Sequence, residues 1–170
     1  MSEAFKYKII CDSREKENMH ILEQFKKHNI PYEVRGLATG DYRIQTLDRN
    51  FVSPVVIERK ASIEELISNI LEKPTPGEKL NRFEKELYRA AKSPNMKLIL
   101  LIEDLNAYEK LLKGDYRSKV NPNAISGKLF ALKARYNFEL IYCDKKYTAS
   151  TIHKILYYAL RENLKGVKLA

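Results

Sequence analysis

Residues 55–71 have the sequence VVIERKASIEELISNIL. The expected fold depends on the change within them from a strand-like apolar run to apolar residues at helical spacing. The apolar run 55–57 follows Pro54 and favours a β-strand, because β-branched residues fit a pleated sheet. Ser62 and Glu65 then form a Ser-x-x-Glu capping box, which is typical of a helix start. Apolar residues follow at helical spacing up to residue 71. The stretch therefore predicts a strand followed directly by a helix.

The same alternation of patterns continues on both sides of this stretch. It predicts an α/β fold, with a mixed β-sheet flanked by helices on both faces, as a single domain over residues 1–170. Residues 98–102 are continuously apolar, so we expect them to form a central strand covered on both faces. The segments 32–34, 42–46 and from 55 onward suggest a β-hairpin. Other strands are expected at 7–11 and 138–143, and helices around 21–25, 62–71, 80–91, 122–132 and 152–160.

Composition indicates a globular protein. The chain has 170 residues, of which 44% are hydrophobic, and its longest apolar run, 98–102, is too short to span a membrane. Residues 1–6 lack the apolar core of a secretion signal, so we expect an intracellular, cytoplasmic protein without membrane association. Cys11 and Cys143 lie in apolar runs without paired spacing and are expected to be buried thiols.

Positive charge is concentrated in the second half of the chain. Residues 1–85 hold 15 basic and 14 acidic residues, whereas residues 86–170 hold 16 and 8. A basic surface of this kind attracts a phosphate backbone, although a solvated helix face is the simpler alternative. Between residues 110 and 135 only Asp115 is acidic, and the basic residues are Lys110, Lys113, Arg117, Lys119, Lys128, Lys133 and Arg135.

The strand that ends in Glu58-Arg59-Lys60 carries the most informative chemistry. Side chains alternate along a strand, so Glu58 and Lys60 should share a face and Arg59 should point away. Asp41 lies on the neighbouring hairpin arm, and Asp12 ends the first strand. Carboxylates beside a lysine can hold a divalent cation and position water for phosphodiester hydrolysis. On spacing alone, Asp41 as a turn residue and 58–60 as a charged strand end remain the alternative.

Other catalytic motifs are absent from the sequence. Gly127-Lys128 lacks the phosphate loop of a nucleotide-binding motif, and His20, His28 and His153 form no zinc-binding pair. The tetrapeptide Gly-Asp-Tyr-Arg of residues 40–43 recurs at 114–117, where Gly114 is more simply the glycine that ends a helix.

Six short motifs occur in the order and rough spacing of the XPF-type nuclease domain, which the chain resembles over about residues 6–160. The resemblance implies a restriction-endonuclease-like fold and metal-dependent cleavage of branched, flap or junction DNA. It implies Mg²⁺ as the cofactor, with Mn²⁺ able to substitute, and a homodimer as the assembly. The motifs are Asp12-Ser13-Arg14-Glu15, Gly40-Asp41-Tyr42, Ile57-Glu58-Arg59-Lys60, Ser62-Ile63-Glu64-Glu65-Leu66, Arg82-Phe83-Glu84-Lys85-Glu86-Leu87 and Leu100-Leu101-Ile102-Glu103.

The resemblance also implies roles for individual residues. Asp41 and Glu58 would be metal ligands together with the carbonyl of Arg59, and Lys60 would position the attacking water. Asp12 would lie in the same cleft as a further catalytic and metal-binding acid. Residues that match the family's phosphate-binding positions and neighbouring acid are Arg14, Arg82 and Glu15.

The chain departs from the family pattern in three places. The family often has Asp four residues after the lysine, where this chain has Glu64 followed by Glu65; because Glu65 belongs to the capping box, Glu64 is weakly favoured as the acid facing the site. The segment between Tyr42 and Glu58 is longer than usual and implies an extended loop at residues 48–53. A tandem helix-hairpin-helix module is expected to be missing, so DNA binding would depend on residues 110–135, a second subunit, or a separate DNA-binding or targeting protein.

The leading hypothesis is a stand-alone Mg²⁺-dependent DNA endonuclease. The alternative is a catalytically silent DNA-docking or dimerisation partner with the same fold. A basic RNA-associated or structural protein would explain the charge but not the order of the motifs. DNA repair, recombination, phage replication and mobile-element processing use the same chemistry, and the sequence does not distinguish them.

Overall fold

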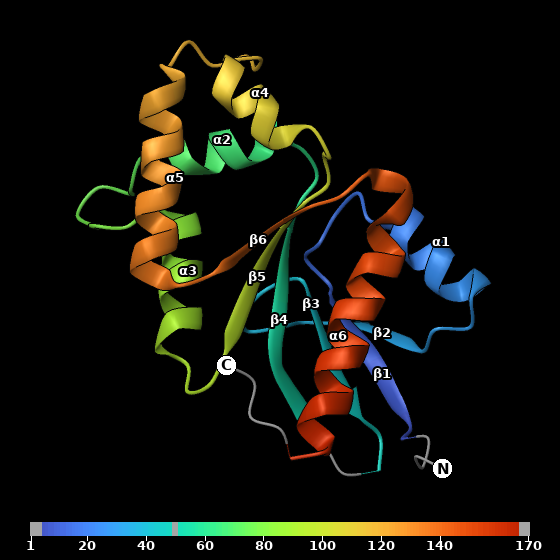
Figure 1. The fold of residues 1–170 in the computed structure, drawn as a ribbon. Helices are drawn as coiled ribbons and strands as arrows, with labels where there is room; N and C mark the ends of the chain where they lie inside the picture. The colour runs from blue at the N-terminus through green and yellow to red at the C-terminus, as the bar shows by residue number, and fades with distance from the viewer. Residues whose placement is uncertain (1–4, 49–50, 167–170) are drawn as a thin grey trace. The chain divides into compact units, whose positions relative to one another are not determined.

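The computed structural model describes residues 5–48 and 51–166, and strands and helices are interspersed along them (Figure 1). Arg49 and Asn50, in the expected extended loop, lie outside the described residues. The strands are β1 (Tyr7–Asp12), β2 (Tyr32–Arg35), β3 (Tyr42–Thr46), β4 (Val52–Lys60), β5 (Lys97–Ile102) and β6 (Glu139–Tyr142). The helices are α1 (Met19–Lys27), α2 (Ile63–Leu71), α3 (Arg82–Lys92), α4 (Ala107–Lys113), α5 (Pro122–Tyr136) and α6 (Thr148–Leu164), with a short 3₁₀ turn at Lys145–Tyr147.

The described strands form a mixed sheet in the order β2-β1-β3-β4-β5-β6. The pairs β1–β2 and β5–β6 are parallel, and the pairs β1–β3 and β3–β4 are antiparallel. The prediction of an α/β fold with a mixed sheet is therefore confirmed. The expected strand at residues 98–102 is buried along its whole length and lies in the interior of the sheet between β4 and β6, although it is next to the edge strand β6 and the centre of the sheet is at β3 and β4.

The predicted hairpin is formed by β3 and β4, whereas β2 pairs in parallel with β1. Strand β4 begins at Val52, three residues before the apolar run that predicted it. Its register against β3 shifts between Arg43 and Gln45, and the additional residues of β4 there include Pro54. A bulge accommodates a proline within a strand because proline has no N–H to donate to the ladder.

The chain divides into two compact units, and β4 contributes to both. The first unit contains residues up to 57 and from 146 onward; in it α6 packs against α1 and β3. Figure 1 shows α1 and α6 side by side in this unit. The second unit contains residues 58–145, where α3 packs against β5, α2 and α5. The expectation of a single domain stays a prediction.

Helix α2 begins where the capping box predicts. The Ser62 Oγ accepts a hydrogen bond from the Glu65 N–H at 3.2 Å, and the Glu65 carboxylate accepts one from the Ala61 N–H at 2.7 Å. Ile63, Leu66, Ile67 and Ile70 form its buried face. Because α2 starts only two residues after β4 ends, the capping box holds the helix close to the Glu58-Arg59-Lys60 segment.

Two other sequence features have the expected structure. Gly114 ends α4 in the left-handed conformation, with φ +72°. Cys11 and Cys143 are both buried and are not joined to each other by a disulfide, and burial, with a smaller effect of Glu15, raises the pKa of Cys11 to about 12. Within the described part of the chain, every helix is too short or too polar to cross a membrane.

Candidate active site

Asp41 occupies a position that the backbone fixes on two sides. Its N–H donates to the Ile57 carbonyl at 2.7 Å, and its own carbonyl accepts from the Asp12 N–H at 2.7 Å. The preceding residue, Gly40, has φ +72°, and a Cβ atom there would lie 2.4 Å from Val56 Cγ2. Only glycine fits this close approach between the hairpin arms. The Gly-Asp pair thus places Asp41 beside the residue that precedes Glu58.

Glu58 and Lys60 lie together at the end of β4, as strand alternation predicts. Each is only 6% exposed, and the Lys60 Nζ donates to the Glu58 Oε1 at 2.7 Å. Arg59 points away from this pair: its Nη1 lies 3.4 Å from Glu103 Oε2, in an ion pair that is also buried. The Glu103 N–H also donates to the Lys60 carbonyl at 2.8 Å. Glu103 thus holds the backbone at Lys60 and the side chain of Arg59.

The environment of Glu58 favours its protonated form. Burial raises the pKa of this carboxyl to about 7; Lys60 lowers it, and the nearby Glu86 carboxylate raises it through charge repulsion and a side-chain hydrogen bond. A buried carboxyl beside a second carboxylate is difficult to ionise. A bound cation would favour the ionised form of Glu58, because it would offset the repulsion from Glu86.

The accessory acids differ from expectation in one respect. The structure brings Glu65, and not Glu64, to the lysine: Glu65 Oε1 lies 4.0 Å from Lys60 Nζ. Glu64 instead accepts a hydrogen bond from the Arg117 N–H at 2.9 Å. The capping interaction directs the Glu65 carboxylate back toward the end of β4, which the weak preference for Glu64 did not anticipate, and the role of Glu64 as an accessory acid stays a prediction.

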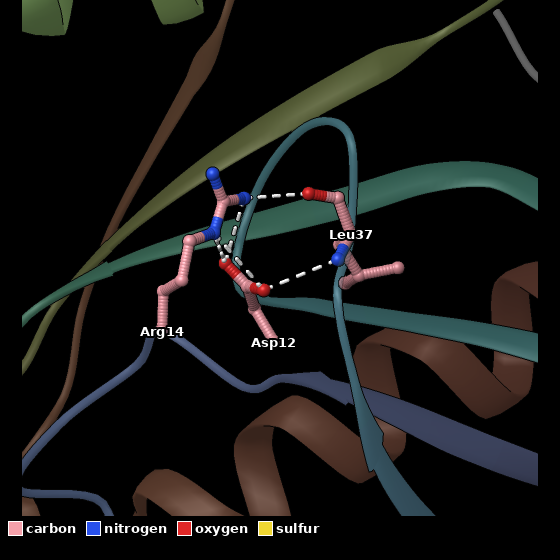
Figure 2. A network of polar contacts seen from close by, with 3 residues as sticks. All are labelled: Asp12, Arg14 and Leu37. Carbon is pink, nitrogen blue, oxygen red and sulfur yellow. Dashed lines mark hydrogen bonds and ion pairs between the residues drawn. The ribbon is translucent and has the colours of Figure 1, made fainter.

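Asp12 and Arg14 form a compact network with the loop before β3 (Figure 2). Arg14 donates from Nε to Asp12 Oδ2 at 2.9 Å and from Nη2 to the Leu37 carbonyl at 2.5 Å. Asp12 Oδ1 accepts from the Leu37 N–H at 3.1 Å. Glu15 is half-buried nearby, and its N–H donates to the Asp12 carbonyl. The predicted residues of the first strand end are thus held to the chain segment that leads to Asp41.

Arg82 and Glu64 line the same open cavity of about 600 Å³ in the second unit. Arg82 is exposed at the start of α3, and the cavity wall also includes Ser68, Glu72 and Ser118. A guanidinium here can contact a phosphate, but two carboxylates share its surroundings.

Many basic side chains of residues 110–135 already form ion pairs with acidic residues or hydrogen bonds with backbone carbonyls. Lys110 pairs with Asp104 at 2.8 Å, Lys113 pairs with Glu109, and Lys128 Nζ donates to the Ile70 carbonyl at 2.7 Å. Two more basic residues, Arg117 and Lys119, are exposed in the loop before α5. Arg135 pairs with Glu84, and Lys133 lies in the last turn of α5.

The sequence-predicted acids fall in both units: Asp12 and Asp41 in the first, Glu58 in the second. Their convergence on one cation stays a prediction. Across residues 5–48 and 51–166, no three His, Cys, Asp or Glu side chains are grouped closely enough to hold a metal ion. The donor set is nevertheless chemically suitable: carboxylate oxygens are the ligands of Mg²⁺, which binds through one or two carboxylates and keeps several waters. The buried Glu58 carboxyl, with the half-buried Glu86 in contact with it, fits such a cation.

Sequence reasoning missed two neighbours of the Glu58–Lys60 pair. Glu86 contacts Glu58, and the Phe83 ring centroid lies 5.1 Å from Lys60 Nζ. Both are on α3, three residues apart, so they share one helix face. The apolar Phe83 indicates which face of α3 points inward, and the three-residue spacing puts Glu86 on that face, but the spacing does not show which residue of the strand end the face meets.

Comparison with known proteins places the chain in a family. The model of the ERCC4 domain matches residues 11–155. No curated protein sequence matches the chain. Among solved structures, XPF from Aeropyrum pernix is similar with a TM-score of 0.65 and 16% identity, covering 93% of this chain and 67% of that one. XPF from Aeropyrum pernix in complex with DNA is similar with a TM-score of 0.63 and 16% identity, covering 92% of this chain and 66% of that one. At this identity the structures establish a shared fold, and the sequence match over most of the length shows that the chain belongs to the ERCC4 domain family.

Proposed function

We propose that this protein is a metal-dependent DNA endonuclease that hydrolyses phosphodiester bonds in branched, flap or junction DNA. The observation that carries the proposal is the buried contact of Glu58 with Lys60 at the end of β4, in a chain of the ERCC4 domain family. A similar structure, XPF from Aeropyrum pernix, was solved in complex with DNA, which supports DNA as the substrate.

Asp41, Glu58 and the Arg59 carbonyl are the groups that we propose to hold the cation. When bound, Mg²⁺ supplies Lewis acidity and offsets the charge that develops on the phosphate. The Glu58 side chain is held by Lys60, and the backbone of Asp41 is held by the bonds of its N–H and carbonyl, so neither the Glu58 side chain nor the Asp41 backbone has to be ordered when substrate arrives. Asp12 was the further ligand that we expected, and its contacts support a different role, which is argued below.

Lys60 is the residue that we propose to orient the attacking water. Its ammonium group contacts Glu58, lies over the Phe83 ring and has Glu65 at 4.0 Å, so its position is restricted on three sides. A positioned ammonium can hold a water by hydrogen bonding and offset negative charge in the transition state. Arg14, Arg82 and the exposed residues of the 110–135 segment would contact phosphates. A second copy of the chain and a separate DNA-binding or targeting protein are the protein partners that we propose.

The test is cleavage of labelled single-strand, duplex, splayed-fork, flap and four-way-junction DNA with Mg²⁺, with Mn²⁺ or with EDTA. Asp41→Asn and Glu58→Gln should abolish cleavage and leave DNA binding intact, because both acids contribute charge to the cation rather than contacts to DNA. Activity should be highest on a branched substrate and absent in EDTA.

Two surface variants provide matched controls. Asp48→Asn and Glu78→Gln make the same chemical changes at exposed positions and should cut like the wild type. Cutting by Glu58→Gln at the wild-type rate would refute the site. Binding of branched DNA without cutting in either metal would favour the catalytically silent docking partner.

A further inference from the structure

The Asp12 carboxylate already has a full set of hydrogen-bond donors. Its Oδ2 accepts from Arg14 Nε and lies 2.9 Å from Arg14 Nη2, while its Oδ1 accepts from the Leu37 N–H and, at 3.3 Å, from Arg14 Nε. A carboxylate has about four acceptor sites, so these contacts use most of its capacity. Figure 2 shows both oxygens directed at Arg14 and Leu37. Arg14 Nε and Nη2 thus converge on Asp12 Oδ2, while Leu37 N–H holds Oδ1, and we call this arrangement the Asp12–Arg14 clamp.

Burial makes the clamp necessary. Asp12 is 4% exposed, and a buried carboxylate is costly unless it is paired and hydrogen-bonded. The side chain of Arg14, by contrast, is 68% exposed. The pair therefore joins a buried anchor to a guanidinium that is accessible from outside. Arg14 Nε and Nη2 are directed at Asp12 and Leu37, so the guanidinium is held in one orientation, and a phosphate would contact it from its exposed side by a charge-assisted hydrogen bond.

Asp12 also connects both ends of the loop that precedes Asp41. Its side chain holds Leu37 near the start of this loop, and its backbone N–H donates to the carbonyl of Asp41 at the end. Arg14 adds a second bond to Leu37, at the carbonyl. One residue thus sets the path of residues 37–41.

The geometry points to Asp12 as a positioning residue that fixes Arg14 as a phosphate-binding group and holds the 37–41 loop, instead of being a ligand of the metal. The inference rests on the proposed function, because it assigns Arg14 to a phosphate of the DNA substrate. It divides the acids of the site into two groups: Asp41 and Glu58 for the cation, and Asp12 for the substrate-binding arginine.

The Asp12→Asn variant distinguishes a role in positioning Arg14 from a role as a metal ligand. The asparagine oxygen can still accept from the Leu37 N–H, but its amide nitrogen cannot accept from Arg14. DNA affinity, measured in EDTA, should therefore fall by about tenfold, as it should for Arg14→Gln, since each change removes a charge-assisted, oriented contact. The double variant should bind no more weakly than Arg14→Gln alone. If Asp12 merely lay near the DNA, Asp12→Asn would raise the DNA affinity instead, because the substitution removes a negative charge that repels phosphates.

Metal affinity provides the second measurement, made without DNA by titrating Mn²⁺ and following its electron paramagnetic resonance signal. Asp12→Asn should bind Mn²⁺ like the wild type, whereas Asp41→Asn should lose about tenfold or more in affinity. Asp48→Asn is the control for the loss of one negative charge. A fall in Mn²⁺ affinity for Asp12→Asn equal to that of Asp41→Asn would overturn the inference, and so would unchanged or stronger DNA binding.

Arg14→Lys extends the test, because this exposed position tolerates substitution even if Asp12→Asn does not fold. Lysine keeps the charge and loses the planar fork, so DNA binding should remain well below the wild type. Wild-type affinity for this variant would show that orientation is unimportant and would reject the clamp. A wild-type protein that binds neither DNA nor Mn²⁺ would instead reject the proposed function, and the inference with it.

Discussion

At the scale of single residues, the buried end of β4 places opposing influences on the charge of one carboxyl group, that of Glu58. Glu58 is stabilised as an anion by Lys60 and destabilised by burial and by Glu86. Strand alternation was enough to predict that Glu58 and Lys60 share a face, because the period of a strand is fixed. Glu86 and Glu65 could not be assigned in the same way, since their approach depends on how α3 and α2 are rotated against the strand end.

The raised pKa of Glu58 predicts a pH-dependent stability. Because its folded-state pKa of about 7 lies above the ordinary value of 4.5, the carboxyl contributes stability that is complete below 4.5 and is lost as the pH rises through 7. Glu58→Gln has no such group. The stability of this variant relative to the wild type should therefore increase by up to about 3 kcal/mol between pH 4.5 and about pH 8. Urea unfolding in EDTA across this range measures it.

Glu78 provides a control, because its contribution to stability should change with pH in the opposite direction to that of Glu58. Its hydrogen bond with Lys85 lowers its pKa, so its contribution is present above 4.5 and lost as the pH falls. The stability of Glu78→Gln relative to the wild type should thus increase as the pH is lowered below about 4.5. If the Glu58→Gln difference showed no dependence on pH, the described burial of this carboxyl would be wrong.

At the scale of elements, the β3–β4 hairpin shows what local sequence determines and what it does not. Gly-Asp-Tyr-Arg occurs at residues 40–43 and 114–117, yet the first copy enters a strand and the second ends a helix. Flanking residues distinguished them: Leu111-Leu112-Lys113 indicates a helix end. The parallel partner of the four-residue strand β2 and the early start of β4 at Val52 were not predictable, because pairing and bulges depend on contacts distant in sequence.

Gly40→Ala should be strongly destabilising. The substitution combines φ +72° with a Cβ atom 2.4 Å from Val56 Cγ2 and 3.0 Å from the Ile57 carbonyl oxygen. We expect a loss of about 3 kcal/mol in the free energy of unfolding, from the left-handed conformation and the overlap together. Gly36→Ala is the matched control, because its Cβ would meet no atom within 4 Å. Equal melting temperatures for the two variants would contradict the tight hairpin.

At the scale of the whole molecule, the net charge of +9 is the property most relevant to a polyanionic substrate. Charge counting identified the basic second half but could not show how it is used. Lys128 is bonded to a backbone carbonyl, and Lys110 and Lys113 are paired with acids, whereas Lys119 is exposed. The basic segment is therefore less uniform than its sequence indicates.

Salt dependence of DNA binding distinguishes these lysines. If Lys119 contacts a phosphate, Lys119→Ala should reduce the slope of log affinity against log salt by about 0.9 for duplex DNA. Lys128→Ala should change this slope less and lower the melting temperature, because it removes the bond to the Ile70 carbonyl at the end of α2. Lys26→Ala, at an exposed position of α1, is the control. Identical slopes for Lys119→Ala and wild type would place the loop away from the DNA.

The two backbone hydrogen bonds of Asp41 limit how often this residue can change position. Short loops such as the one between β2 and β3 ordinarily rearrange in nanoseconds to microseconds. Residue 41 of this loop, however, is hydrogen-bonded to β1 through Asp12 and to β4 through Ile57. It can change position only when these ladders open, and interior strands open about as rarely as the molecule unfolds. The backbone at Asp41 therefore stays in place during many substrate encounters. If Asp41 holds the cation proposed above, DNA would have to adjust its own shape to that cation instead of waiting for the protein to move.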